Sequence, residues 1–85
     1  MAGHELSTSE YRQYARKYVD SSRAQQIKHW RVNQRMSFSQ IATLVKSRYG
    51  DNDISVNSGS HSDGKILCEA AREKLREPRS VWENY

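Results

Sequence analysis

The most informative group of charged residues in this 85-residue chain is a run of cations with no carboxylate among them. The run spans residues 23–48 and contains Arg23, Lys28, Arg31, Arg35, Lys46 and Arg48, whereas Asp and Glu are spread through the rest of the chain. Guanidinium and ammonium groups gathered in this way attract polyanions and pair well with phosphate. The run therefore predicts a polyanion-binding surface, with nucleic acid as the first candidate and a merely solvated basic face as the alternative.

The other reactive residues do not form a catalytic or metal-binding pattern. The four residues with imidazole or thiol groups have no zinc-site spacing, and these are His4, His29, His61 and Cys68. No nucleophile comes with both a base and an orienting acid. We therefore expect a protein that is not an enzyme, holds no metal or cofactor and has no small-molecule substrate. The fourth helix predicted below should hold Cys68 as a small core residue.

A glycine-rich segment before residue 66 needs a separate interpretation. Residues 59–65 match a phosphate-binding loop until Ile66, which stands where Ser or Thr would hold magnesium. A nucleotide-binding sheet does not fit in so short a chain, so Gly59 and Gly64 are predicted to serve a turn.

Length and composition indicate one small domain spanning residues 1–85. A chain of this size buries only about 60% of the surface that it exposes when unfolded, and 35% of its residues are apolar. These values favour an all-α bundle of three to four short helices. The single cysteine excludes an intrachain disulfide, and no apolar run has the length of a signal-peptide core or a membrane span. We therefore expect a cytoplasmic protein that does not contact membranes.

Hydrophobic spacing predicts the elements that must position the cations. Ser7 and Glu10 form a capping box before a first helix, whose apolar stripe consists of Tyr11, Tyr14, Ala15, Tyr18 and Val19. The spacing of the three tyrosines predicts that they belong to the core, in preference to forming a platform on which bases stack. A second helix is predicted over residues 22–35, with Ala24, Ile27 and Trp30 facing inward.

Two further helices follow a break at residues 36 and 37. Ser37 and Gln40 form a second capping box, and the third helix has a stripe of Phe38, Ile41, Ala42, Val45 and Tyr49 that ends at Gly50. The fourth helix begins near residue 62, carries Ile66, Leu67, Ala70, Ala71 and Leu75, and stops before Pro78. Residues 1–6 and 78–85 are predicted to be flexible tails.

The third helix and the segment after it, MSFSQIATLVKSRYGDNDISVNS, resemble the first half of a bacterial or phage helix-turn-helix domain. In that family a Ser-led helix carries an Ile-Ala pair that packs against the next helix, and Ile41 and Ala42 match this pair. The resemblance implies a helix-turn-helix-like unit within residues 37–75. The usual turn has three or four residues, so either this joint is longer or a recognition helix begins at Ser55. Residues 54–60 could equally form a short strand or a loop.

These considerations assign three groups of candidate site residues. Phosphate contacts are predicted for Lys28, Arg31, Arg35, Ser37, Ser39, Gln40, Lys46 and Arg48. Base or groove contacts are predicted for Ser55, Asn57, Ser58, Ser60, His61 and Lys65. An aromatic tail consists of Val81, Trp82 and Tyr85, and it could dock on the core, pair two copies of the chain or remain frayed.

The function predicted first is binding of duplex DNA, as a transcriptional regulator or as an accessory factor in replication, recombination or packaging. One such module binds weakly, so a homodimer is expected. An adaptor or a phage-encoded inhibitor of a host protein is the alternative, because Trp and Tyr are common interface anchors. An RNA or single-strand binder is the third reading.

Overall fold

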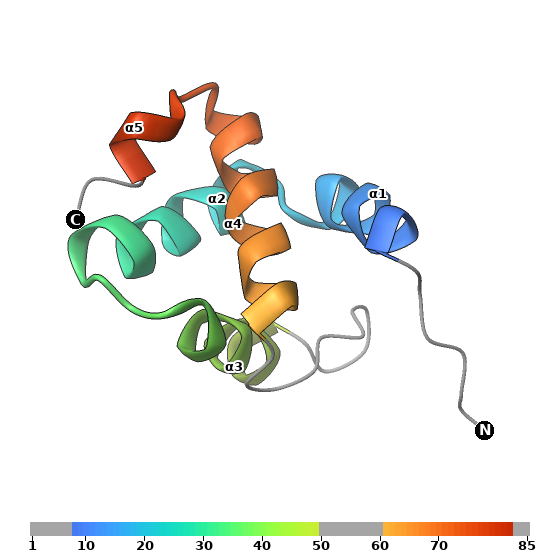
Figure 1. The fold of residues 1–85 in the computed structure, drawn as a ribbon, viewed down its shortest axis with the longest axis horizontal. Coiled ribbons are helices and arrows are strands. Elements are labelled where there is room, and N and C mark those ends of the chain that lie inside the picture. Colours follow the sequence, from blue (N-terminus) through green and yellow to red (C-terminus); the bar gives the residue numbers. More distant parts are fainter. Residues whose placement is uncertain (1–7, 50–60, 83–85) are drawn as a thin grey trace.

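The computed structural model describes residues 8–49 and 61–82, and every element in these two ranges is helical (Figure 1). In chain order they are α1 (Thr8–Tyr18), α2 (Ser21–Lys28), the π-helix η1 (His29–Asn33), α3 (Phe38–Tyr49), α4 (His61–Leu75) and α5 (Arg79–Trp82). The predicted all-α class is therefore confirmed. The expected strand or loop at residues 54–60 lies outside the described residues.

Helix α4 is the centre of the bundle. It contacts α1, α2 and α3, which surround it in Figure 1, while α5 lies against η1. Six of its residues are buried: Gly64, Ile66, Leu67, Cys68, Ala70 and Ala71. Small residues dominate this set, so the neighbouring helices approach α4 closely and a short chain still forms a dense core.

The apolar stripes read from the sequence meet on α4. Ala15, Val19, Ile27, Ile41 and Leu67 have no exposed surface, and Tyr11, Tyr18 and Trp30 are at most 8% exposed. The prediction that the tyrosine stripe belongs to the core is confirmed for Tyr11 and Tyr18, and Tyr14 packs against them half-buried. Burial and the charge of Asp63 raise the pKa of Tyr11 above its ordinary value, so this phenol stays protonated.

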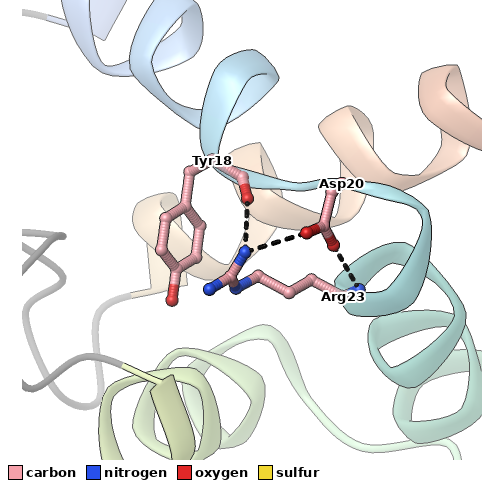
Figure 2. Close-up of polar contacts among 3 residues, drawn as sticks. All are labelled: Tyr18, Asp20 and Arg23. Carbon is pink, nitrogen blue, oxygen red and sulfur yellow. Dashed lines mark hydrogen bonds and ion pairs between the residues drawn. The ribbon is translucent and has the colours of Figure 1, made fainter.

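A polar corner joins α1 to α2 (Figure 2). Asp20 is the N-cap of α2 and accepts a hydrogen bond from the Arg23 amide, 2.9 Å from N to Oδ1. The Arg23 guanidinium donates to the other carboxylate oxygen of Asp20 and to the Tyr18 carbonyl, at 3.1 and 3.3 Å, and lies 4.4 Å from the centre of the Tyr18 ring. Arg23, the first cation of the basic run, therefore stabilises this corner.

The second predicted helix ends in wider turns than expected. Residues 29–33 form η1, in which the Gln34 amide donates to the His29 carbonyl at 3.1 Å, and the Met36 amide reaches back to the Trp30 carbonyl at the same distance. Arg35 lies between them with φ at 57°. A left-handed residue reverses the chain after a helix, and glycine usually holds this position because a Cβ is strained there.

Helix α4 ends in a second left-handed arginine. Arg76 has φ at 57°, its amide donates to the Glu73 carbonyl, and the Glu77 amide donates to the Arg72 carbonyl, both at 3.1 Å. This pair of hydrogen bonds is the Schellman motif. Pro78 follows at once and prevents the helix from continuing, as predicted.

The prediction of a flexible tail from residue 78 is wrong for residues 79–82. These residues form α5, and Trp82 is only 4% exposed because its ring packs into the core. The Trp82 Nε1–H donates to Glu77 Oε1 at 2.9 Å, and Lys28 forms an ion pair with the other Glu77 oxygen. Docking on the core was one of the possibilities that the sequence left open for the aromatic tail, and it holds for Trp82. The ion pair beside it could not be read from the sequence, because Lys28 and Glu77 are 49 residues apart.

The Glu77 contacts make stability depend on pH. The hydrogen bond from Lys28 above all, helped by that from Trp82, holds the pKa of Glu77 below its ordinary value, although burial acts in the opposite direction. A carboxyl whose pKa is lowered by folding stabilises the native state above its unfolded pKa of 4.5, and that stabilisation disappears as the pH falls through the folded pKa. We therefore expect Glu77→Gln to lower the urea midpoint at neutral pH. The difference from the unchanged protein should shrink as the pH falls below 4.5 and through the lower pKa of the folded state. A difference that does not change with pH would contradict this origin.

Gly64 does not serve the predicted turn. It lies buried within α4, and a Cβ built on it would stand 1.9 Å from the carbonyl oxygen and 2.6 Å from the carbonyl carbon of Phe38. The first residue of α3 therefore touches the backbone of α4, which only glycine allows. This contact fixes how α3 is placed on the bundle. Among the described residues, no helix has the length and apolarity needed to cross a membrane.

Candidate nucleic-acid interface

Helix α3 has one buried face and one polar face. Ile41, Ala42 and Val45 are fully buried against the bundle, as the stripe predicted. The opposite side exposes Gln40, Thr43, Lys46, Ser47 and Arg48, with Ser39 and Leu44 half-buried. The helix contains no Asp or Glu, and both of its cations lie in its last turn. Its outward surface is therefore polar and positively charged at one end.

The start of α3 is held by the predicted capping box. The Ser37 amide donates to Gln40 Oε1 at 3.0 Å, and the Gln40 amide donates to Ser37 Oγ at 3.1 Å. The Thr43 hydroxyl donates to the Ser39 carbonyl at 3.1 Å. The capping interpretation of Ser37 and Gln40 is thus confirmed. Their side chains hold the helix end in place, and their assignment as phosphate ligands stays a prediction.

The side chains of Lys28 and Arg31, which the sequence predicted as phosphate ligands, contact other parts of the protein. Lys28 is paired with Glu77, and the side chains of both residues are less than one-third exposed. Arg31 donates to the Met36 carbonyl at 2.7 Å, and its guanidinium lies 3.9 Å from the centre of the Phe38 ring. These contacts join the end of α2 to the turn before α5, and η1 to the start of α3. Neither residue belongs to the outward face of α3.

Arg35, Lys46 and Arg48 are the exposed cations that the sequence placed at the site. Arg35 lies in the turn directly before α3, and the other two lie in its last turn. The structure therefore puts positive charge at both ends of the polar face. Two acids of α4 face α1, since Arg12 and Arg16 on α1 form ion pairs with Glu69 and Glu73 at 3.8 and 3.1 Å.

The outward face is hollowed near its start. A shallow open depression of about 400 Å³ is lined by Met36, Ser39, Gln40, Thr43 and Leu44. Met36 and Leu44 give it an apolar part, and the hydroxyls and amide give it a polar part. Such a mixed surface is able to contact methyl groups and hydrogen-bonding edges at once.

The predicted base-reading segment is only partly described. Ser55, Asn57, Ser58 and Ser60 lie outside the described residues. His61 and Lys65 occupy the first turns of α4 and are exposed. The His61 ring meets the Phe38 ring edge-on, with 5.1 Å between centres, so it contacts the start of α3. Thr43 and Ser47 were not among the predicted readers, although they lie opposite the stripe that the sequence already revealed.

Trp82 does not belong to an exposed dimer interface as predicted, because its ring is buried within its own chain. Val81 is half-buried against the core, and Tyr85 lies outside the described residues. The aromatic tail therefore contributes to the core of this chain through α5. Comparison with known proteins adds no assignment, because no family model, curated protein or solved structure matches the chain.

Proposed function

We propose that this protein binds duplex DNA with the outward face of α3 in the major groove. The observation that carries the proposal is the acid-free polar face of α3, with Arg35 before it and Lys46 and Arg48 at its end. The cations would hold the phosphates, while Thr43 and Ser47 would face base edges. An α-helix with its side chains is about 10–12 Å wide, which matches the width of the major groove.

The connection before α3 also supports this role. Residues 34–37 form a four-residue link between η1 and α3, and Figure 1 shows the chain turning there from η1 towards α3. Helix-turn-helix units use links of three or four residues and read DNA with their second helix. We therefore assign the reading role to α3, in place of the segment after it that the sequence favoured. Helix α4 is less suitable, because three other helices contact it.

Regulation of transcription, or an accessory role in replication, recombination or packaging, is the wider function that such binding would serve. A single module of this size contacts few base pairs, so two copies on adjacent half-sites would be needed for high specificity. The first test is a fluorescence-anisotropy titration with random duplex DNA at about 50 and 200 mM salt, where several phosphate contacts should cost roughly a hundredfold in affinity. Absence of binding at the lower salt concentration would overturn the proposal.

Removing the cations of α3 should weaken this complex specifically. We expect Lys46→Ala with Arg48→Ala to lower DNA affinity by about tenfold and to reduce the salt slope by about two. The matched control is Lys17→Ala with Lys74→Ala, which removes the same charge from exposed positions on α1 and α4. Equal weakening by both pairs would mean that net charge alone attracts DNA, and the assignment of α3 would be wrong.

The left-handed arginines provide a second comparison. Arg35 and Arg76 both have a φ of 57°, at which a Cβ atom is strained. Arg35→Gly and Arg76→Gly remove this strain, so each should raise the free energy of unfolding by about 1 kcal/mol. Arg35→Gly should nevertheless weaken DNA binding severalfold, whereas Arg76→Gly, at the far end of α4, should leave it unchanged. Thermal unfolding and anisotropy on the same samples measure both effects. If Arg35→Gly stabilises the protein without loss of affinity, Arg35 does not contact DNA.

A protein partner is the second candidate, because the depression on α3 has an apolar part. Met36 and Leu44 are half-buried there and could receive an apolar side chain of another protein. Leu44→Asn separates the two functions, since it removes an apolar anchor and leaves the cations in place. If Lys46→Ala lowers DNA affinity and Leu44→Asn does not, the result favours DNA as the partner. If Leu44→Asn abolishes the binding of a protein partner and Lys46→Ala leaves DNA affinity unchanged, the result favours a protein.

A further inference from the structure

A second basic site lies away from the outward face of α3. It is a small pocket of about 40 Å³ between η1, α4, α5 and the start of α3, and none of its residues lines the depression on α3. Three cations contribute to its lining, namely Arg31, Lys65 and Arg72. Glu69 is the one carboxylate among the described residues that line it, and it also pairs with Arg12. The pocket therefore carries a net positive charge.

Two of these cations are held in place before any ligand arrives. Arg31 is fixed by its hydrogen bond to the Met36 carbonyl and by its stacking on the Phe38 ring. Arg72 donates to the Glu77 carbonyl at 3.4 Å. Lys65 is exposed on the second turn of α4. Cations that are already positioned lose little conformational freedom when they bind an anion, which favours binding.

The remaining walls strengthen the attraction. Phe38 and Trp82 line the pocket with aromatic surface, which lowers the local dielectric constant and increases the force between opposite charges. Cys68 also lines it, and burial raises the pKa of its thiol to about 12, so the floor of the pocket carries no negative charge at neutral pH. Among the described residues that line the pocket, Glu69 alone carries a negative charge.

The volume limits what the pocket can hold. A cavity needs about 10–15 Å³ for one water molecule, so 40 Å³ corresponds to roughly three waters. Sites for whole organic ligands are several hundred Å³. A nucleobase is therefore too large, whereas the oxygens of a tetrahedral oxyanion suit both the size and the three cations.

We propose that this pocket binds a phosphoryl group through Arg31, Lys65 and Arg72. The group could belong to a free phosphorylated compound or to the backbone of a nucleic acid, since both present the same oxygens. The site does not use the outward face of α3, although Phe38 at the start of that helix lines it. Its test therefore does not require the protein to bind DNA through that face.

The test is a titration of the full chain with inorganic phosphate at constant ionic strength, monitored by two-dimensional NMR. The Nε1–H signal of Trp82 and the amide signals of Lys65 and Arg72 should move saturably at millimolar phosphate. The Nε1–H of Trp30, the second tryptophan, is the internal reference because its ring does not line the pocket. Chloride at equal ionic strength should not reproduce the shifts.

Three variants make the result specific. Lys65→Met keeps the aliphatic stem but removes the charge, and should weaken phosphate binding by about tenfold. Glu69→Gln removes the opposing charge and should strengthen it by roughly threefold. Lys74→Met, a cation of the same helix outside this pocket, should change nothing. Thermal unfolding of each variant verifies that it is folded.

A short duplex then identifies the source of the phosphoryl group. If the duplex moves the Lys65 and Trp82 signals and displaces phosphate, the pocket takes a backbone phosphate. If the duplex leaves these signals unchanged while phosphate still binds, the pocket takes a free phosphorylated compound. No saturable shift with phosphate, or an equal affinity in Lys65→Met, overturns the proposal, and neither result bears on the α3 variants.

Discussion

Replacing Gly64 by alanine is expected to lower the free energy of unfolding by about 3 kcal/mol. The added methyl carbon would stand 1.9 Å from the Phe38 carbonyl oxygen, and that atom belongs to the backbone of α3 and cannot turn aside. Helices α3 and α4 would have to separate, which opens gaps between Ile41, Val45 and Leu67. Urea denaturation followed by circular dichroism measures the loss.

The sign of this change makes the prediction decisive. In an exposed helix interior, glycine to alanine stabilises by about 1 kcal/mol, so packing and helix propensity predict opposite results. Lys74→Ala is the control, because Lys74 is exposed on the same helix and its replacement should be nearly neutral. If Gly64→Ala stabilised the protein, α3 would not lie against α4 as described. The same crossing orients the outward face of α3, on which the proposed DNA binding depends.

Replacing Trp82 by alanine should destabilise the protein by about 3 to 5 kcal/mol. The ring is 4% exposed, lies in the core and donates a hydrogen bond to Glu77, so its loss leaves a cavity and removes one of the donors to that carboxylate. Because α5 contacts η1, its release should also loosen Arg31 and Lys28. Thermal and urea unfolding test the effect, and the tryptophan emission of the remaining Trp30 reports the core.

Trp82→Phe separates the two contributions. This change retains most of the apolar ring and removes the hydrogen bond, so it should cost only about 1 kcal/mol. An interface anchor would behave differently, since Trp82→Ala would then leave unfolding of the single chain unchanged and would reduce only the binding of a partner. Such an outcome would restore the tail that the sequence predicted and would contradict the docking of α5.

The cations of the basic run illustrate how far sequence reasoning reaches at the candidate site. Their number and the absence of acids among them are properties of the sequence. These properties favour a polyanionic partner before the fold is known. Which of them face outward depends on contacts that form only in the folded chain. Lys28 pairs with Glu77, and Arg31 is held against Met36 and Phe38 beside the small pocket, while Lys46 is exposed on α3.

The sequence by itself determined the features that arise from neighbours within one or two turns. The stripes of α1, α3 and α4, the capping box of Ser37 and Gln40 and the stop before Pro78 follow from contacts between residues three or four apart, and such contacts leave a periodic signal. The tertiary structure alone decided that Gly64 lies at a helix crossing, that Lys28 pairs with Glu77 and that Trp82 is buried. The physical reason is that each depends on backbone or side chains brought together from distant parts of the chain, and steric contact at such a distance leaves no pattern in the order of the residues.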